Sequence, residues 1–352
     1  MNADIAVVAF AQSPQVRETT GTTNGVEDLV PLFRQLFAET GLSRHDIGFW
    51  CSGSSDYLAG RAFTFVQAVD AIGAWPPIVE SHVEADGAWA LYEAWVKILT
   101  GEADTALVYG FGKSSAGELR RVLALQLDPY LVAPLWPDSV SLAALQARVG
   151  LEAGLWSEKE MAEVAARSRV DGSANPNAQL SGQVDPAALL DEPYLADPLR
   201  AHDCAPITDG AAAIILARGD RARELCERPA WITGIAHHVD SPALGARDLS
   251  RAPSASAAAA AAGGIDGVQL AELAAPFTSQ ELLLRRELRL GDEVRINPSG
   301  GPLCGNPLFA GGLVRIGEAA ARVRDGSAQR VLAHATNGPL LQQNLICVME
   351  GR

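Results

Sequence analysis

The chain alternates short apolar runs with stretches in which apolar residues recur at helical spacing. Residues 5–11 (IAVVAFA) form a continuous apolar run, as in a strand that is buried on both faces. Between residues 26 and 37 the apolar positions repeat every three or four residues and stop before Gly41, which predicts an amphipathic helix. Further strands are expected at 47–51, 77–82 and 105–111, with helices at 63–72 and 87–99. This order predicts an α/β protein with a mostly parallel sheet covered by helices.

The pattern changes between residues 112 and 206, which are rich in Pro, Ala and Asn and read as an inserted segment packed over the sheet. After a strand at 209–218, a second series of alternating elements follows. Its strands are expected at 231–236, 268–273, 330–336 and 344–349, and its helices at 281–288 and 310–323. The second half therefore repeats the first in kind. We expect an N-terminal half over 1–218, which contains the insertion, and a C-terminal half over 219–352.

An alanine-rich run over 254–264 has two interpretations. It has the composition of a low-complexity linker, but alanine is also the best helix former and allows close helix packing. We favour the helix.

Composition and charge limit the possible partners. The 352 residues are 48% hydrophobic and 20% charged, which is typical of a soluble globular protein. Asp and Glu number 42 against 28 Lys and Arg, for a formal net charge of −14, and the sequence has no Lys/Arg cluster. Binding to nucleic acid or to an anionic membrane depends on clustered positive charge, so we expect neither partner.

The five cysteines are far apart and have no metal-ligand spacing, so no metal site is expected. An odd number of scattered cysteines is typical of a reduced, cytoplasmic protein. The N-terminus, Met-Asn-Ala-Asp, is acidic and lacks a signal-peptide pattern, and no apolar stretch is long enough to span a bilayer. We expect a cytoplasmic protein without a membrane span.

Two long motifs resemble the thiolase superfamily. Residues 197–213 read DPLRAHDCAPITDGAAA and residues 297–312 read NPSGGPLCGNPLFAGG, in the order found in its sterol-carrier-protein-type branch. Within that branch the sequence is similar to actinobacterial proteins, named as lipid-transfer proteins, that act as steroid side-chain CoA lyases. The resemblance implies the thiolase fold, in which two βαβαβαββ halves form five αβαβα layers with an inserted loop domain. It also implies a coenzyme A thioester as substrate, with no other cofactor.

The catalytic positions of the superfamily are changed in this chain. The motif that carries the nucleophilic cysteine resembles residues 82–91 (HVEADGAWAL), and the cysteine position falls on Glu84. A carboxylate at a helix N-terminus has the chemistry of a general base, so Glu84 and the nearby Asp86 are candidates. The alternative is that Asp86 is only a helix N-cap and that Glu84 only complements the helix dipole.

The other catalytic motifs also lack their titrating residues. The oxyanion-hole histidine is replaced by Ala274, while Glu272 and Phe277 of that motif remain. The activating histidine is replaced by Asn306, which can polarise a thioester oxygen but cannot carry a proton at neutral pH. The second cysteine falls near Ala335, which leaves His334 as a polar neighbour with possible catalytic function. Thiolysis is therefore not expected.

The resemblance also implies positions that contact the substrate. The segment over 240–245 resembles the loop that covers the pantetheine arm, although its Pro and Gly would equally form a turn. The residues expected to bind CoA or the acyl group are Ser241, Leu244, Gly245, Ser299, Gly300, Phe277 and Gly338.

A retro-aldol cleavage needs only removal of a β-hydroxyl proton and stabilisation of the departing enolate, so it is compatible with these losses. We therefore expect an acyl-CoA lyase of lipid or steroid side-chain catabolism, with Glu84 as base and with Asn306 and the backbone near Gly338 holding the enolate. The alternatives are a non-catalytic scaffold subunit and, more weakly, a lipid-binding module. The expected assembly is a homodimer, or a heteromer with a thiolase-like paralogue or a small acyl-CoA-binding protein.

Overall fold

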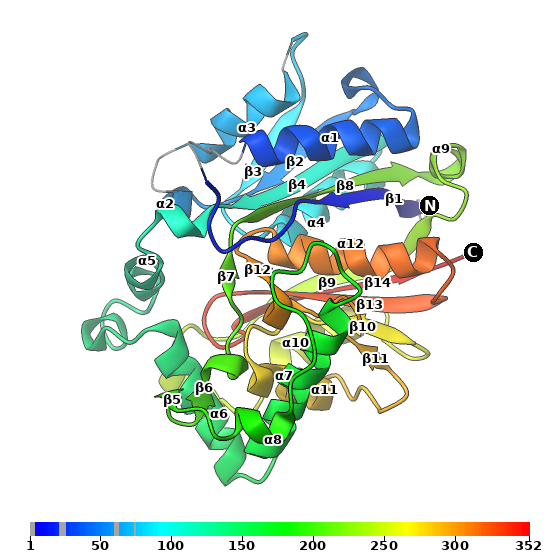
Figure 1. Ribbon diagram of the computed structural model, residues 1–352. Helices are drawn as coiled ribbons and strands as arrows, with labels where there is room; N and C mark the ends of the chain where they lie inside the picture. The colour runs from blue at the N-terminus through cyan, green and yellow to red at the C-terminus, as the bar shows by residue number, and fades with distance from the viewer. Residues whose placement is uncertain (1–3, 21–25, 60–62, 74) are drawn as a thin grey trace.

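The computed structural model describes residues 4–20, 26–59, 63–73 and 75–352. Its central feature is a ten-stranded sheet with the order β11-β10-β13-β14-β9-β1-β8-β4-β2-β3 (Figure 1). The strands of the first half are β1 (Ile5–Gln12), β2 (Phe49–Gly53), β3 (Glu80–Val83), β4 (Thr105–Gly112) and β8 (Gly210–Arg218). Those of the second half are β9 (Ala230–Val239), β10 (Leu270–Glu272), β11 (Arg295–Ile296), β13 (Arg330–Asn337) and β14 (Gln343–Glu350).

The two sets of strands have the same topology. Numbered along the chain within each set, both lie in the order 3-2-4-5-1. In both sets the fifth strand is antiparallel to its two neighbours, and the other pairings are parallel. The sets join where Ala6 and Val7 of β1 pair with Trp231 and Ala230 of β9. This repeat confirms that the second half resembles the first, while the exact boundaries of the halves and of the insertion stay predictions.

The helices complete the expected order in each half. The first half has α1 (Val26–Thr40), the short α2 (Asp56–Ala59), α3 (Thr64–Ile72) and α4 (Gly87–Leu99) between its strands. The second has α10 (Pro253–Ala261), α11 (Thr278–Glu287) and α12 (Gly311–Arg324), and α9 (Gly219–Leu225) connects the halves. Apart from the extra turn of α2, both halves read βαβαβαββ. The helix α10 confirms the interpretation of the alanine-rich run.

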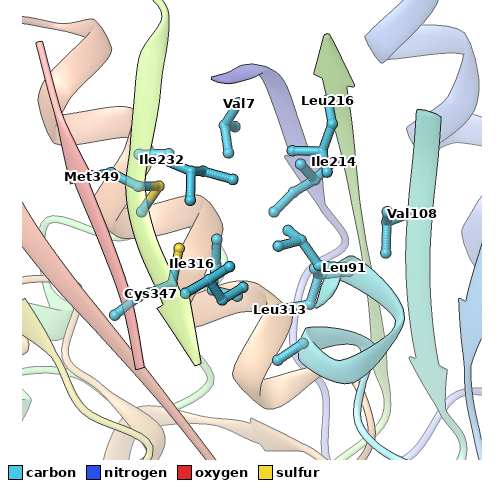
Figure 2. Close-up of a cluster of buried hydrophobic side chains, with 14 of the residues drawn as sticks. Val7, Leu91, Val108, Ile214, Leu216, Ile232, Leu313, Ile316, Cys347 and Met349 are labelled. Carbon is cyan, nitrogen blue, oxygen red and sulfur yellow. The ribbon is translucent and has the colours of Figure 1, made fainter. Parts of the chain in front are cut away.

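The core is arranged in layers around two central helices. One buried cluster combines α4 and α12 with the inward faces of both sets of strands. Figure 2 shows its centre, where Leu91 of α4 and Leu313 and Ile316 of α12 lie between Ile214 of β8 and Cys347 of β14. A second cluster lies between the first set of strands and α1 and α3, and a third between the second set and α10 and α11 (Figure 1). The result is the αβαβα arrangement that the resemblance implies.

The segment between β4 and β8 packs mainly on the second half of the molecule. It contains α5 (Leu119–Leu125), α6 (Ser139–Glu152), α7 (Glu158–Gly172), α8 (Pro186–Leu189) and the short strands β5 (Tyr194–Ala196), β6 (Leu199–Arg200) and β7 (Ile207–Thr208). Arg167 of α7 forms a 2.6 Å ion pair with the buried Glu281 of α11. Gln280 of α11 donates a hydrogen bond of 2.9 Å to Gln146 of α6. Polar contacts therefore tie the insertion to α11.

Some element boundaries differ from the expected ones. The strand expected at 47–51 begins at Phe49, because Ile47 ends a short 3-10 helix over Arg44–Asp46. The strand expected at 77–82 begins at Glu80, since the prolines before it lack the N–H group of a ladder. Residues 1–3 of the acidic N-terminus, for which no signal peptide is expected, lie outside the described residues. Within the described part of the chain, no helix is long and apolar enough to cross a membrane.

Glycine allows the first turn of α4 to lie directly against β2. A Cβ atom built on Gly53 would lie 2.5 Å from the backbone nitrogen of Gly87, where the contacting atoms are backbone and cannot rotate away. Space around Gly245, by contrast, is open within 4 Å.

We therefore expect Gly53→Ala to lower the free energy of unfolding by about 1–3 kcal/mol, the usual cost of overpacking. Gly245→Ala is the matched control and should change it by less than about 0.5 kcal/mol. Urea unfolding followed by circular dichroism measures both. Equal stability of the two variants would show that the close approach of α4 to β2 is not tight.

Candidate active site

A pocket with a volume of about 410 Å³ is lined by both halves and by the inserted segment. Its lining is mostly apolar, and the charged side chains in it are Asp86, Arg120, Asp138 and Arg315. Arg120 and Asp138 form a 2.9 Å ion pair in which the Arg120 side chain is 74% exposed. Asp86 and Arg315 are 5% and 2% exposed. The pocket lining therefore includes one partly exposed ion pair and two buried ionisable side chains.

Asp86 lies where the N-termini of the two central helices meet. It is the N-cap of α4, and its Oδ1 accepts the backbone N–H of Ala88 at 2.8 Å. The same carboxylate accepts N–H groups from the first turn of α12, from Gly312 at 2.9 Å and from Leu313 at 3.2 Å. One carboxylate thus caps both helices, and the partial positive charges of both helix ends are directed at it.

Burial raises the pKa of Asp86 above its ordinary value, and the three backbone N–H groups together with nearby Arg315 oppose this rise. Removal of water penalises the charged form, while the hydrogen bonds favour it. Because a general base works best when its pKa approaches the working pH, this environment suits proton transfer.

Arg315 extends from α12 into a buried polar cluster beneath the pocket. Its Nη1 donates to Oε2 of Glu272 at 2.6 Å and to Oγ of Ser299 at 2.6 Å. Glu272 is fully buried in β10, and it also accepts the backbone N–H of Ser299 at 3.0 Å and the Ser299 hydroxyl at 2.8 Å. Glu272 and Ser299 therefore fix the orientation of the guanidinium.

The loop before α12 brings Asn306 to the pocket. Asn306 and Pro307 form the short strand β12 (Asn306–Pro307), which pairs in parallel with β7. Phe309 has a φ of 67°, and its carbonyl oxygen accepts the N–H of Gly87 at 2.8 Å. This bond holds the loop against the start of α4, so that Asn306 and Asp86 line the same cavity.

The turn between β13 and β14 forms another wall, over residues 336–341. Arg247 donates to the carbonyl oxygen of Pro339 at 3.2 Å and to that of Leu340 at 2.6 Å. Asn344 donates to the carbonyl oxygen of Leu341 at 2.8 Å and accepts from Nε2 of His334 at 2.8 Å. The partly buried Arg247 and the buried Asn344 therefore hold the backbone of this turn in place.

The chain matches no protein-family model. It is 28% identical over 293 residues to an acetyl-CoA acetyltransferase of Methanothermobacter thermautotrophicus, across 74% of this chain and 76% of that protein. It is 30% identical over 156 residues to a 17-hydroxy-3-oxo-4-pregnene-20-carboxyl-CoA lyase of Mycobacterium tuberculosis, across 41% of this chain and 40% of that protein.

Solved structures with the same fold include one titled "Ltp2-ChsH2(DUF35) aldolase", with a TM-score of 0.81, 18% identity, and coverage of 99% of this chain and 98% of that one. The acetyl-CoA acetyltransferase of Bacillus anthracis has a TM-score of 0.80 and 16% identity, across 100% of this chain and 99% of that one. The chain is therefore similar in sequence and in fold to proteins of the thiolase superfamily. The expected thiolase fold is confirmed.

In this thiolase-like chain, four of the expected site residues line one pocket: Asp86, Asn306, Phe277 and Gly338. Glu84, the expected base, is not among its lining residues. Its Oε1 accepts the backbone N–H of Asp56 at 3.0 Å, and its Oε2 lies 3.6 Å from Nε2 of His82. The side chain is turned toward α2 and the β3 edge, so of these two expected carboxylates only Asp86 lines the pocket, where the other carboxylate, Asp138, is paired with Arg120.

The remaining expected residues lie around the pocket rather than in its lining. His334 is fully buried in β13, and burial lowers its pKa to about 4. Ser299 and Gly300 are buried and are absent from the lining. Ser241, Leu244 and Gly245 lie in the loop after β9, where the Ser241 hydroxyl accepts the N–H of Ala243 at 3.2 Å. None of these residues lines the pocket, so their expected roles in substrate binding or catalysis stay predictions.

Sequence patterns did not identify Arg315 as a site residue. A signal is nevertheless present, since Arg315 lies among the apolar residues of a helix predicted to face the core. An arginine at such a position needs a buried partner. The partner, Glu272, is 43 residues away in the sequence, so the pairing could not be inferred from local spacing.

The described cysteines do not supply a thiolate to the pocket. Cys204 lines the pocket, but burial raises its pKa to about 12. Cys304 lies beneath the pocket, where its Sγ donates to the carbonyl oxygen of Ser168 at 3.0 Å and burial raises its pKa to about 11. A protonated thiol is a weak nucleophile. Among the described residues, no group of His, Cys, Asp and Glu side chains is placed to hold a metal ion.

The burial of His334 predicts a pH dependence of stability. Its pKa is about 4 in the folded state against 6.5 for the ordinary side chain, so the folded state favours the neutral imidazole. The resulting stabilisation is fully present above pH 6.5 and is lost as the pH falls toward 4, by roughly 3 kcal/mol. His334→Gln keeps an N–H donor for Asn344 but cannot titrate. It should flatten the pH profile of the unfolding free energy between pH 7 and 4.

His45 is exposed and provides the matched control, His45→Gln, whose profile should follow that of the unchanged protein. Urea unfolding at several pH values measures all three proteins. If His334→Gln retains the full acid dependence, the imidazole is not held neutral by burial.

Proposed function

We propose that this chain is an acyl-CoA lyase that cleaves a β-hydroxyacyl-CoA by retro-aldol chemistry. The observation that carries this proposal is the Asp86 carboxylate, which lines an apolar pocket beside Asn306 without a neighbouring thiolate. The chain is similar in sequence to a protein named as a steroid-CoA lyase and in structure to one titled as an aldolase, and both similarities support this reaction class. By the same relations, we place the reaction in lipid or steroid side-chain catabolism.

In the proposed reaction, Asp86 accepts the proton of the β-hydroxyl group. The bond between the α and β carbons then breaks, and the β carbon leaves as a ketone or aldehyde. The electron pair of that bond forms the enolate of the thioester. A proton is finally returned to the α carbon, which yields a shorter acyl-CoA. This sequence needs no covalent intermediate and no cofactor besides the CoA thioester itself.

The pocket residues have separate roles in this proposal. The Asn306 amide and the backbone near Gly338 donate hydrogen bonds to the thioester oxygen as negative charge develops there. The apolar walls, which include Phe277, hold the acyl group and exclude water, so that these electrostatic interactions are strengthened. We propose that the CoA arm enters past the Arg120–Asp138 pair, because Arg120 is the most exposed charged side chain of the lining.

The surface also supports an oligomer. Among the described strands, β3 ends the ten-stranded sheet and has a strand neighbour on one side only. Phe63, Trp75 and Val79 near this edge are strongly exposed. An open strand edge with exposed apolar side chains is favourable for association with another chain. We propose that this edge binds a second copy or a thiolase-like paralogue.

A second proposed function is a non-catalytic subunit that scaffolds a heteromeric complex. Two observations favour it. None of the five tyrosines, all of which are described, lines the pocket, so no phenol supplements Asp86 as an acid. In addition, Tyr130, Leu131 and Leu135 are strongly exposed beside the segment of α5 that forms one pocket wall. A small acyl-CoA-binding partner that covers these residues would complete the site.

A pair of carboxylate variants tests the proposed base. Asp86→Asn should lower kcat for retro-aldol cleavage by about 10²- to 10⁴-fold, the usual contribution of a general base. Glu84→Gln should leave kcat within about threefold, since Glu84 is turned away from the pocket. The substrate is a β-branched β-hydroxyacyl-CoA, and released carbonyl product and shorter acyl-CoA are both quantified.

Because Asp86 also caps two helices, Asp86→Asn is expected to lose about 1–3 kcal/mol of stability. Circular dichroism and the affinity for an unreactive CoA thioether establish that the variant is folded when it is assayed. Loss of cleavage in Glu84→Gln but not in Asp86→Asn would restore Glu84 as the base and overturn this assignment.

The two proposed functions differ in what the purified chain does alone. A lyase complete in one type of chain cleaves the substrate without addition. A scaffold subunit does so only after mixing with the small acyl-CoA-binding protein, and its melting temperature then rises because the partner binds the folded state. Leu135→Glu should reduce the activity gained on mixing with the partner by at least tenfold. It should leave the activity of a chain that cleaves the substrate alone unchanged.

A further inference from the structure

Arg315 is a buried cation whose hydrogen-bonding capacity is only partly used. A guanidinium has five N–H donors, and those of Nη1 are directed to Glu272 and Ser299. The Nε atom is buried and has no hydrogen-bond partner among the described residues. An unsatisfied donor on a buried charged group is costly. Arg315 also lines the pocket, and the structure describes no hydrogen bond of its Nη2 atom, so the donors of Nη2 and Nε are the candidates for an acceptor on a bound ligand.

We propose that Arg315 is a catalytic residue that binds the negatively charged oxygen of the thioester enolate. This inference rests on the lyase activity proposed above and adds to it the cation that stabilises the intermediate. The two remaining donor positions of the guanidinium, Nε and Nη2, are the ones that would face the oxygen.

The site is better suited to an enolate that forms inside the pocket than to an anion that binds from solution, because forming the enolate adds no net charge to the pocket. In the proposed reaction Asp86 begins as the carboxylate, the form that burial disfavours and that Arg315 and three backbone N–H groups favour. When Asp86 accepts the hydroxyl proton it becomes neutral, and the same unit of negative charge appears on the thioester oxygen. The total charge of the pocket is unchanged. In this scheme Arg315 attracts first the carboxylate and then the enolate, while its 2.6 Å contact with Glu272 is kept throughout.

Glu272 and Ser299 have a positioning role in this scheme. A guanidinium held on one nitrogen cannot rotate freely, so its other donors are preorganised for the oxygen. The bonds come from a buried strand and from the backbone turn before the Asn306 loop, both of which are rigid parts of the fold. Lysine would supply a charge but not this fork of donors.

A pair of CoA thioethers tests the inference without turnover. S-Carboxymethyl-CoA places a negative oxygen near the position of the enolate oxygen, whereas S-ethyl-CoA is neutral there. Calorimetry with the full chain should give an affinity about 10- to 100-fold higher for S-carboxymethyl-CoA, as expected for a charge-assisted hydrogen bond.

Arg315→Met should abolish the preference and leave the affinity for S-ethyl-CoA within about threefold. That variant leaves Glu272 buried without its counterion, so the double variant Arg315→Met/Glu272→Gln provides a charge-balanced form in case the single one does not fold. Arg322→Met is the matched control, since Arg322 lies on the same helix and outside the pocket. It should keep the full preference.

An unchanged protein with equal affinity for the two thioethers would overturn the inference. So would an Arg315→Met/Glu272→Gln protein that retains the preference. The lyase proposal can fail separately. In that case the chain still prefers S-carboxymethyl-CoA but does not cleave β-hydroxyacyl-CoA. A chain that binds neither thioether would overturn both.

Discussion

The N-terminus of a helix carries a partial positive charge and unpaired N–H groups. Where two N-termini meet, one acceptor group can serve both. In this protein α4 and α12 meet in that way at the centre of the molecule, and the Asp86 carboxylate accepts N–H groups from both. The close approach leaves no room for a side chain at Gly312, where a Cβ atom would lie 2.4 Å from Oδ1 of Asp86. The hydrogen bonds of one buried carboxyl group therefore join α4 of the first half to α12 of the second.

The pocket is a consequence of this junction. Helix ends that point toward each other leave a space beyond their first turns, and the loop with Asn306 and the turn with Gly338 enclose it. Buried polar groups support these walls from behind. His334 and Asn344 hold the turn through its Leu341 carbonyl, and Glu272 and Ser299 hold Arg315. The residues that surround the pocket thus act mainly by positioning the few that line it.

The fold could be predicted from the sequence to a large extent because it depends on patterns that are local. The alternation of apolar runs with amphipathic helices, repeated in two halves, reflects sheets that are buried on both faces. The candidate site was predicted less well. Glu84 and Asp86 are two residues apart at the end of β3, where side-chain direction is set by the turn into α4, and only Asp86 is directed at α12. The Arg315–Glu272 pair joins distant segments, so no spacing rule could reveal it.

The proposed cleavage differs from thiolysis because thiolysis consumes free coenzyme A and the retro-aldol reaction does not. The most direct measurement is the product balance when the purified chain, with any co-purifying partner, is incubated with a branched β-hydroxyacyl-CoA in the presence and absence of free CoA. We predict one ketone or aldehyde for each shorter acyl-CoA, at a rate that free CoA does not increase. Cleavage of a β-ketoacyl-CoA that consumes one free CoA for each turnover would contradict the retro-aldol mechanism.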